Sequence, residues 1–150
     1  MSLESDVKLL AGLKLFSVMT VESLKLIAFA AETRSFRAGD LLFRQGELSH
    51  GGYVVLSGTV ALDPSQNGAA AARIIGHGGL LGELALLLAT RNPVTAIARE
   101  NSTILKISRT LFLRTLEESP ASARNVKAAL RQDLQTFVLD LKLVGNSFPE

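Results

Sequence analysis

Glycine residues divide the middle of this chain into short runs, and this punctuation limits the possible folds more than any other sequence feature. The runs lie between about Thr33 and Ile107 and have the pattern of strands rather than of helices. We expect seven strands there: Ser35–Arg37, Leu41–Gln45, Tyr53–Leu56, Thr59–Leu62, Arg73–Ile75, Thr95–Arg99 and Thr103–Ile107. Many short strands that alternate with glycine turns predict an antiparallel sandwich or barrel.

The N-terminal part of the chain has a helical period instead. From Ser5 to about Glu32, apolar residues recur at helical spacing. Thr20 stands in the position of a helix N-cap. The apolar stripe after it consists of Leu24, Ile27, Ala28 and Ala31.

The C-terminal part is helical as well. A short helix is expected over Leu111–Glu118, with Ser108 or Thr110 as its N-cap. Pro120 separates it from a long amphipathic helix over Ala121–Leu143.

The 150 residues are expected to form one domain, because this length is close to that of a typical domain. Helices then occupy residues 1–32, strands 33–108 and further helices 109–143. A domain of this size buries enough surface that it needs no metal or disulfide to fold.

Composition excludes several functional classes. Without cysteine there is no disulfide framework, no cysteine-ligated metal site and no thiol nucleophile. The two histidines, His50 and His77, lie far apart, and no Ser/His/Asp constellation is recognisable, so we expect neither a metal site nor an enzyme. A net charge of +2, spread along the chain, is too small for a typical nucleic-acid binder. The sequence shows no signal peptide and no membrane span, which predicts a cytoplasmic protein.

The densest group of functional signals runs from Gly76 to Ala85, with the sequence GHGGLLGELA. A glycine-rich turn leads here into a helical turn that starts near Glu83. The free amide groups of such a turn can bind an anion, and glycine lets the backbone approach a phosphate closely. The alternative is a glycine-rich hairpin followed by a turn that packs into the core.

The surroundings of this turn resemble the phosphate-binding cassette of the cyclic nucleotide-binding domain family, which includes Crp/Fnr-type regulators and the regulatory subunits of cAMP-dependent kinase. Three further motifs match that family: Phe36–Asp40 as F-x-x-G-[DE], Phe43–Glu47 with its Q-G-[DE] element, and Tyr53–Val60 as a strand pair. The resemblance covers about residues 10–143. It implies an eight-stranded antiparallel β-roll, which is a jelly-roll-like double-stranded β-helix. N-terminal helices precede this roll, and a long C-terminal helix follows it.

The resemblance also implies a role for several residues of the cassette, which spans residues 82–95. Gly82 and Glu83 would meet the ribose and the phosphate, with Glu83 accepting from the ribose 2′-hydroxyl. The amide groups of Leu84 and Ala85 would face the cyclic phosphate. Thr95, at the end of the cassette, is a further candidate for ligand binding.

The cassette departs from the family pattern where the phosphate is expected. Asn92 stands in the place of the arginine that pairs with the phosphate, and Pro93, which has no amide N–H, follows it. Because a hydrogen bond to a charged group contributes about 1.5–3 kcal/mol, these changes are expected to weaken binding about tenfold to several-hundred-fold. Arg91 is the candidate for compensation, although neighbouring residues of an extended segment point to opposite sides.

The stripe on the long C-terminal helix allows two interpretations. Val126, Leu130 and Leu134 could pack on the body of the domain as core. Alternatively, Leu130, Leu134, Phe137 and Leu141 could form a seam with a second copy, because their spacing is close to a heptad. The second interpretation predicts a homodimer.

The function that the resemblance implies is a non-catalytic sensor that binds a cyclic nucleotide, with cAMP as the first expectation, and that holds no other cofactor. Binding would reposition the C-terminal helices, which requires different ligand affinities in two helix arrangements. No recognition helix follows the long helix, so direct DNA binding by this chain is not expected. The alternative function is a degenerate module that binds no nucleotide and serves as an interaction or dimerisation platform.

Overall fold

The computed structural model describes residues 2–64 and 73–145, and from residue 137 onwards its backbone alone. Three helices come first: α1 (Leu3–Ala11), α2 (Lys14–Ser17) and α3 (Val21–Ala30). The strands follow as β1 (Glu32–Phe36), β2 (Leu41–Phe43), β3 (Gly51–Ser57), β4 (Val60–Asp63), β5 (Arg73–Ile75), β6 (Leu80–Leu81), β7 (Thr95–Ala98) and β8 (Ser102–Ser108). A single 3₁₀ turn, η1 (Leu84–Leu86), lies between β6 and β7, and the helices α4 (Arg109–Glu118) and α5 (Pro120–Gly145) end the described chain.

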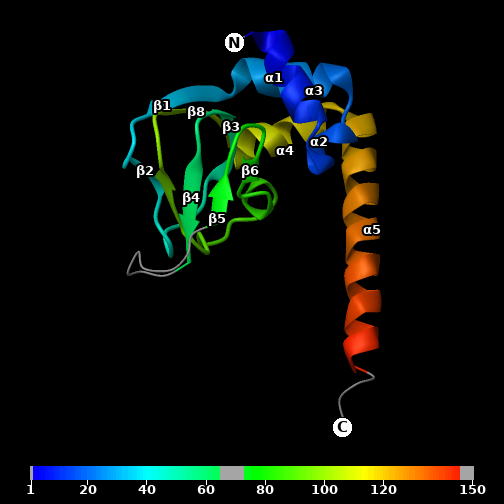
Figure 1. Cartoon of the computed structure of the whole chain (residues 1–150). Coiled ribbons are helices and arrows are strands. Elements are labelled where there is room, and N and C mark those ends of the chain that lie inside the picture. The colour runs from blue at the N-terminus through cyan, green and yellow to red at the C-terminus, as the bar shows by residue number, and fades with distance from the viewer. Residues whose placement is uncertain (1, 65–72, 146–150) are drawn as a thin grey trace.

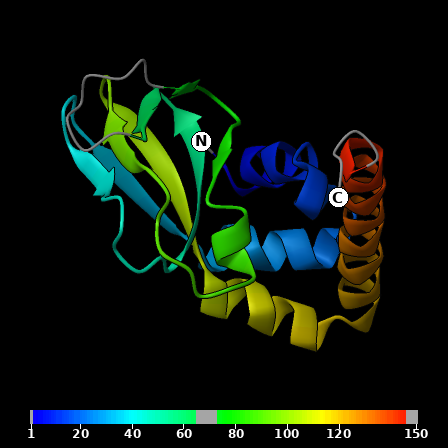
Figure 2. The same ribbon diagram turned by 90° about the horizontal axis from the view of Figure 1, so that it is seen from below.

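The strands form two antiparallel sheets of four, with the orders β1-β8-β3-β6 and β2-β7-β4-β5. The sheets face each other as a roll, and the helices gather at one end of it (Figures 1 and 2). The expected eight-stranded β-roll with flanking helices is therefore confirmed.

All seven expected strands are present: β5 has the expected ends, the other six have shifted ends, and β6 was not predicted. β6 has only two residues, which pair with Tyr53 and Val54 of β3. Because the strand is so short, no run of strand-forming residues predicts it. β3 begins at Gly51, two residues earlier than expected, because Gly51 and Gly52 pair with Ser108 and Ile107. The approach at Gly51 is so close that a Cβ there would lie 2.1 Å from the carbonyl oxygen of Ile107.

Hydroxyl side chains cap the N-termini of α3 and α4, as expected. Thr20 caps α3, since its Oγ1 accepts a hydrogen bond from the amide of Ser23 at 3.2 Å. Of the two candidates for α4, Ser108 is the cap, and its Oγ accepts from the amide of Leu111 at 3.0 Å. These bonds satisfy amide groups that a helix leaves without a partner at its first turn.

The buried apolar side chains form two clusters. One fills the roll between the sheets and includes Val55, Val60 and Ile104. The other lies between the sheet that contains β3 and the helices, where the rings of Phe16 and Phe112 meet edge to face with centroids 5.6 Å apart. The helical end is thereby fixed against the roll.

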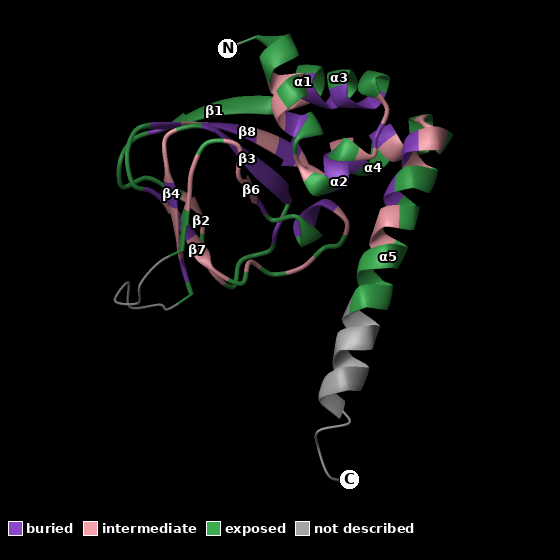
Figure 3. Cartoon of the chain, turned by 45° about the vertical axis from the view of Figure 1, so that its right-hand side comes forward, coloured by how far each residue is buried: buried purple, intermediate pink, exposed green. Residues whose placement is uncertain are grey.

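Only the first part of α5 belongs to this second cluster. Val126 is buried and Leu130 partly buried against it, as the core interpretation predicted. Leu134 is 60% exposed, so the core interpretation is wrong for this residue. Figure 3 shows that buried and intermediate residues lie near the start of α5 and exposed residues follow further along the described helix. The side chains of Phe137 and Leu141 lie outside the described residues, and the seam with a second copy stays a prediction.

Candidate ligand-binding site

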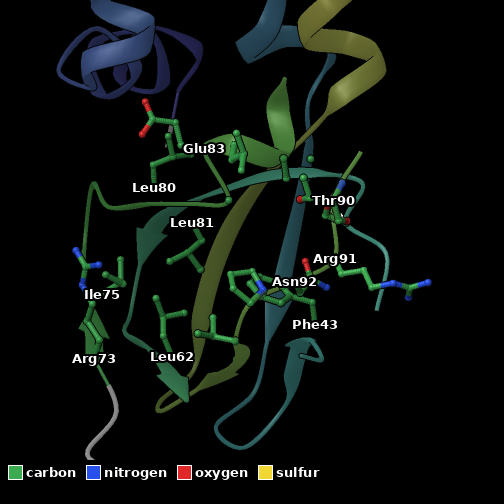
Figure 4. Close-up of a pocket in the computed structure, with 17 residues that line it drawn as sticks. Phe43, Leu62, Arg73, Ile75, Leu80, Leu81, Glu83, Thr90, Arg91 and Asn92 are labelled. Carbon is green, nitrogen blue, oxygen red and sulfur yellow. Dashed lines mark hydrogen bonds between the residues drawn. The ribbon is translucent and has the colours of Figure 1, made fainter. Parts of the chain in front are cut away.

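A cavity of about 440 Å³ opens where the roll meets the glycine-rich turn. Its wall is mostly apolar, with Leu62, Leu81 and Phe43 among the side chains that Figure 4 shows around it. The wall comes from β2, the start of β3 with Ser49, β4, β5, β6, the turn at 82–85 and the segment 90–94. Six of the seven residues predicted from sequence line this cavity: Gly82, Glu83, Leu84, Ala85, Arg91 and Asn92.

The turn has the conformation that its sequence favours. Gly82 has φ +77°, in the left-handed region, and a Cβ there would lie 3.0 Å from the carbonyl oxygen of Gly51. The helical turn expected near Glu83 is present as η1, which Glu83 precedes. The carboxylate of Glu83 makes no capping bond to η1 and is exposed. Figure 4 shows it pointing away from Leu62 and Leu81, toward the helical end of the molecule.

The first amide groups of this turn are available as donors. The amides of Leu86 and Leu87 donate to the carbonyls of Glu83 and Leu84, at 3.2 and 3.0 Å. By contrast, the amides of Leu84 and Ala85 donate none of the hydrogen bonds found in the described part of the chain. Two adjacent residues with free N–H groups therefore lie at the wall of the cavity.

Arg109, the first residue of α4, donates hydrogen bonds to carbonyl groups of the turn and of two neighbouring segments. Its Nη1 donates to the carbonyl oxygens of Ala85 at 3.0 Å, Leu88 at 3.1 Å and Ser49 at 3.3 Å. A guanidinium group suits this task because it carries several donors in a fixed fork. Arg109 could not be predicted from the sequence, since its partners are distant along the chain and no motif marks them.

The segment that contains Asn92 is tied to the loop after β2. The amide of Asn92 donates to the carbonyl of Glu47, and the amide of Gly46 donates to the carbonyl of Asn92, both at 2.8 Å. The side chain of Asn92 donates to the carbonyl of Arg44 at 3.1 Å. The only side-chain hydrogen bond of Asn92 among the described residues is thus made within the protein.

The guanidinium group of Arg91 donates to the carbonyl of Gly46 at 2.9 Å and is turned outward, away from the cavity (Figure 4). Arg91 and Asn92 therefore point to different sides, as expected for an extended segment. Thr95, the seventh predicted residue, does not line the cavity. Its hydroxyl accepts from the amide of Gln45 at 3.0 Å and joins the start of β7 to the loop after β2.

The cavity also contains residues that the sequence did not indicate. Arg73 of β5 lies at the wall opposite Asn92, beside Ile75 (Figure 4). The apolar wall includes Phe43, Leu62 and Val94. An exposed arginine in a short strand has no signal of its own, and only the pairing of β5 with β4 brings Arg73 to the site.

Within the described residues, no group of three His, Asp or Glu side chains could hold a metal ion. None of the helices in the described part is long and apolar enough to span a membrane.

Comparison with known proteins gives a family match. The model of a family described as "Cyclic nucleotide-binding domain" matches residues 33–119. The chain is similar to the cyclic AMP receptor protein of Thermus thermophilus, with 30% identity over 136 residues that cover 89% of this chain and 63% of the relative. It is also similar to the lysophospholipase NTE1 of Candida albicans, with 34% identity over 116 residues that cover 73% of this chain and 8% of that protein.

A solved structure, that of a cyclic nucleotide-binding-like protein from Brucella abortus, superposes with a TM-score of 0.70 at 37% identity. The match covers 75% of this chain and 98% of the Brucella chain. The chain thus spans less than two thirds of the length of the two curated relatives, whereas it matches nearly the whole of the Brucella structure.

Proposed function

The chain belongs to the cyclic nucleotide-binding domain family, and from this premise we propose that it is a non-catalytic sensor whose cavity takes a cyclic nucleotide, with cAMP as the first candidate. Domains of this family are regulatory in type, although the lysophospholipase relative carries the matching segment within an enzyme. The proposal therefore concerns this domain, not the activity of any longer protein.

The observation that carries the proposal is the position of the free amides of Leu84 and Ala85 at the cavity wall. Amide groups that have no partner within the protein can donate to phosphate oxygens without loss of an existing hydrogen bond. The left-handed Gly82 allows the backbone to turn there, and Arg109 holds the turn by a hydrogen bond to the carbonyl of Ala85. The turn is thus arranged in advance to accept an anionic group.

The apolar part of the wall suits the rest of such a ligand. Phe43, Leu62 and Leu81 offer contact area for a flat base, while polar groups are few. Glu83 is the acceptor that we assign to the ribose 2′-hydroxyl. Because its carboxylate points away from the cavity floor in the structure, this role requires a rotation of the side chain.

The phosphate is expected to receive few charge-assisted hydrogen bonds. Asn92 is neutral and donates to the carbonyl of Arg44, Pro93 has no N–H, and Arg91 is turned outward. We therefore expect affinity well below that of a site with an arginine at position 92, by about tenfold to several-hundred-fold.

Transmission to the C-terminal helices has a direct route in this proposal. Arg109 joins the turn at Ala85 to the first residue of α4, and α4 packs against α5. A ligand that shifts the turn would move α4 through this bond. We also propose that the exposed apolar face of α5, which includes Leu134, contacts a second copy of the chain.

The second candidate function is an interaction or dimerisation platform that binds no nucleotide. The hydrogen bonds of Arg91 and Asn92 to the protein's own carbonyls favour it, because each side chain already donates within the protein.

The double change Asn92→Arg with Pro93→Ala separates the two functions. It adds a cation and an amide N–H at the expected phosphate position, so the sensor predicts tighter cAMP binding, by about tenfold or more. Calorimetric titration of this variant and of the unchanged protein measures the gain, and circular dichroism checks that both are folded. No gain in a folded variant would show that position 92 does not face the phosphate.

A further inference from the structure

A second hollow, of about 490 Å³, lies beside the cavity described above. Phe43, Ser49 and Asn92 line both, so these three residues lie between them. Figure 4 shows Phe43 and Asn92 together at one side of the first cavity. The remaining residues of the second hollow have no part in the proposed function: Leu42, Glu47, Leu48, His50, Tyr53 and Lys106.

Lys106 stands on the face of β8 that is turned toward the interior of the roll. It is opposite Tyr53 in the register of β3 and β8, and opposite residues of such a pair point to the same face. Tyr53 and Ile104, which precedes Lys106 by two positions, both belong to the apolar cluster inside the roll. A lysine at such a position is unusual, because removing its ammonium group from water costs free energy unless a partner offsets it.

The ammonium group of Lys106 has no anionic partner among the described residues. Its Nζ lies 6.0 Å from the centre of the Tyr53 ring, and neither ion pair found there involves it. Glu32 is opposite Lys106 in the register of β1 and β8, but its carboxylate lies 3.7 Å from Nε of Arg34. The hydroxyl of Tyr53 also makes no hydrogen bond within the described part of the chain. Two donors without an acceptor thus line the same hollow.

The rest of the second hollow is apolar except for its other polar lining groups, of which Glu47 is negatively charged. Leu42, Phe43 and Leu48 line it, and Leu48 is 58% exposed although it is a large apolar residue. An anionic group is therefore attracted at Lys106, whereas a second negative charge in the same ligand would be repelled by Glu47. This arrangement suits a ligand with one negative charge and an apolar body.

We propose that the second hollow binds a small organic monocarboxylate, at a site separate from the proposed nucleotide cavity. The carboxylate of the ligand accepts hydrogen bonds from Nζ of Lys106 and from the hydroxyl of Tyr53. Its apolar body lies against Leu42, Phe43 and Leu48, as is usual in small-molecule sites, where a few polar groups fix the orientation. The ligand supplies the anionic partner that Lys106 lacks within the protein. The proposal does not rest on the proposed function, and its test needs no cyclic nucleotide.

Titration of the isotope-labelled protein with benzoate, followed by NMR, tests this site. Saturable chemical-shift changes are expected at the amides of Leu48, Tyr53 and Lys106. The amides of Leu62 and Ile75, which line the first cavity alone, are expected to stay unchanged. Benzamide has the same ring without the charge, and it is expected to bind about tenfold more weakly or less, because charge-assisted hydrogen bonds are lost.

Two variants test the donors one at a time. Lys106→Gln is expected to weaken benzoate binding about tenfold or more. Tyr53→Phe keeps the ring and removes the hydroxyl, and it is expected to weaken binding about two- to tenfold, since a neutral donor contributes less. Lys25→Gln is the matched control, because Lys25 is an exposed lysine of α3 that lines neither hollow. Circular dichroism checks that each variant is folded.

Benzoate binding that Lys106→Gln weakens and Lys25→Gln leaves unchanged would support the site. The proposal is overturned if benzoate causes no saturable change, if benzamide binds equally well, or if the two lysine variants behave alike. Changes confined to Leu62 and Ile75 would place benzoate in the first cavity and overturn the proposal as well. A protein that binds benzoate as expected but no cyclic nucleotide would contradict the proposed function alone.

Discussion

Arg109 Nη1 donates a hydrogen bond to the carbonyl oxygen of Ala85 at 3.0 Å, and this bond connects the first residue of α4 to the turn that lines the cavity. The same group also reaches the carbonyls of Leu88 and Ser49. Three carbonyl oxygens from two separate segments thus accept hydrogen bonds from one side chain. Arg109 therefore links the turn directly to α4.

Arg109→Gln is expected to lower the free energy of unfolding by about 1.5–3 kcal/mol, because hydrogen bonds to a charged group are lost. Ligand affinity is expected to fall as well, since the turn is no longer held in place. Urea denaturation and titration with cAMP measure the two effects. Arg114→Gln, at an exposed position of the same helix, is the control and should change neither quantity. A stability equal to that of the control would contradict the role of Arg109.

Gly82→Ala is expected to destabilise the protein by about 1–3 kcal/mol. A side chain at φ +77° is strained, and the new Cβ would lie 3.0 Å from the carbonyl oxygen of Gly51. Gly76→Ala is the control, because a Cβ there has open space and φ is not positive. Thermal denaturation should separate the two variants by several degrees. Equal melting temperatures would show that the turn tolerates a side chain.

Ser122→Ala tests the hydroxyl cluster of Thr20, Ser23 and Ser122, which joins the first turn of α5 to α3. The change removes the partner of the Thr20 amide and one of the two partners of the Ser23 hydroxyl, which costs about 1–3 kcal/mol. Ser57→Ala, at an exposed position, should have little effect. The difference between their free energies of unfolding in urea measures the contribution of the cluster, and a difference near zero would be incompatible with it.

Burial raises the pKa of Tyr53, while Arg34 opposes this shift and Glu32 adds to it. Below about pH 10 the folded and unfolded states both keep the phenol proton, so stability is unaffected. Above that pH the unfolded chain loses the proton first, and the free energy of unfolding falls until Tyr53 ionises in the folded state. Tyr53→Phe should lack this component of the decline. Parallel pH profiles for both proteins would contradict the assignment.

The local features of the fold could be predicted from the sequence. Thr20 and Ser108 act as caps because a helix start needs an acceptor within three residues. Gly82 takes the left-handed conformation that the glycine-rich turn requires. In each case the residues that determine the conformation lie within a few positions of it, so local sequence patterns are enough to predict it.

Features that depend on distant partners could not be predicted. β6 exists because Leu80 and Leu81 meet β3, and Arg73 reaches the cavity only through the pairing of β5. Arg109 contacts carbonyls 21 to 60 residues away. Thr95 was expected to bind the ligand because of its place in the cassette, but it does not line the cavity. Its hydroxyl accepts a hydrogen bond from the amide of Gln45, a residue 50 positions earlier in the chain.

The most direct test of the central claim is calorimetric titration of the unchanged protein with cAMP and, separately, with cGMP at moderate salt. The account predicts saturable binding with one site per chain, weakened by the neutral Asn92 and by Pro93. Flat titrations with both nucleotides, on protein that circular dichroism shows to be folded, would contradict the sensor and favour the interaction platform.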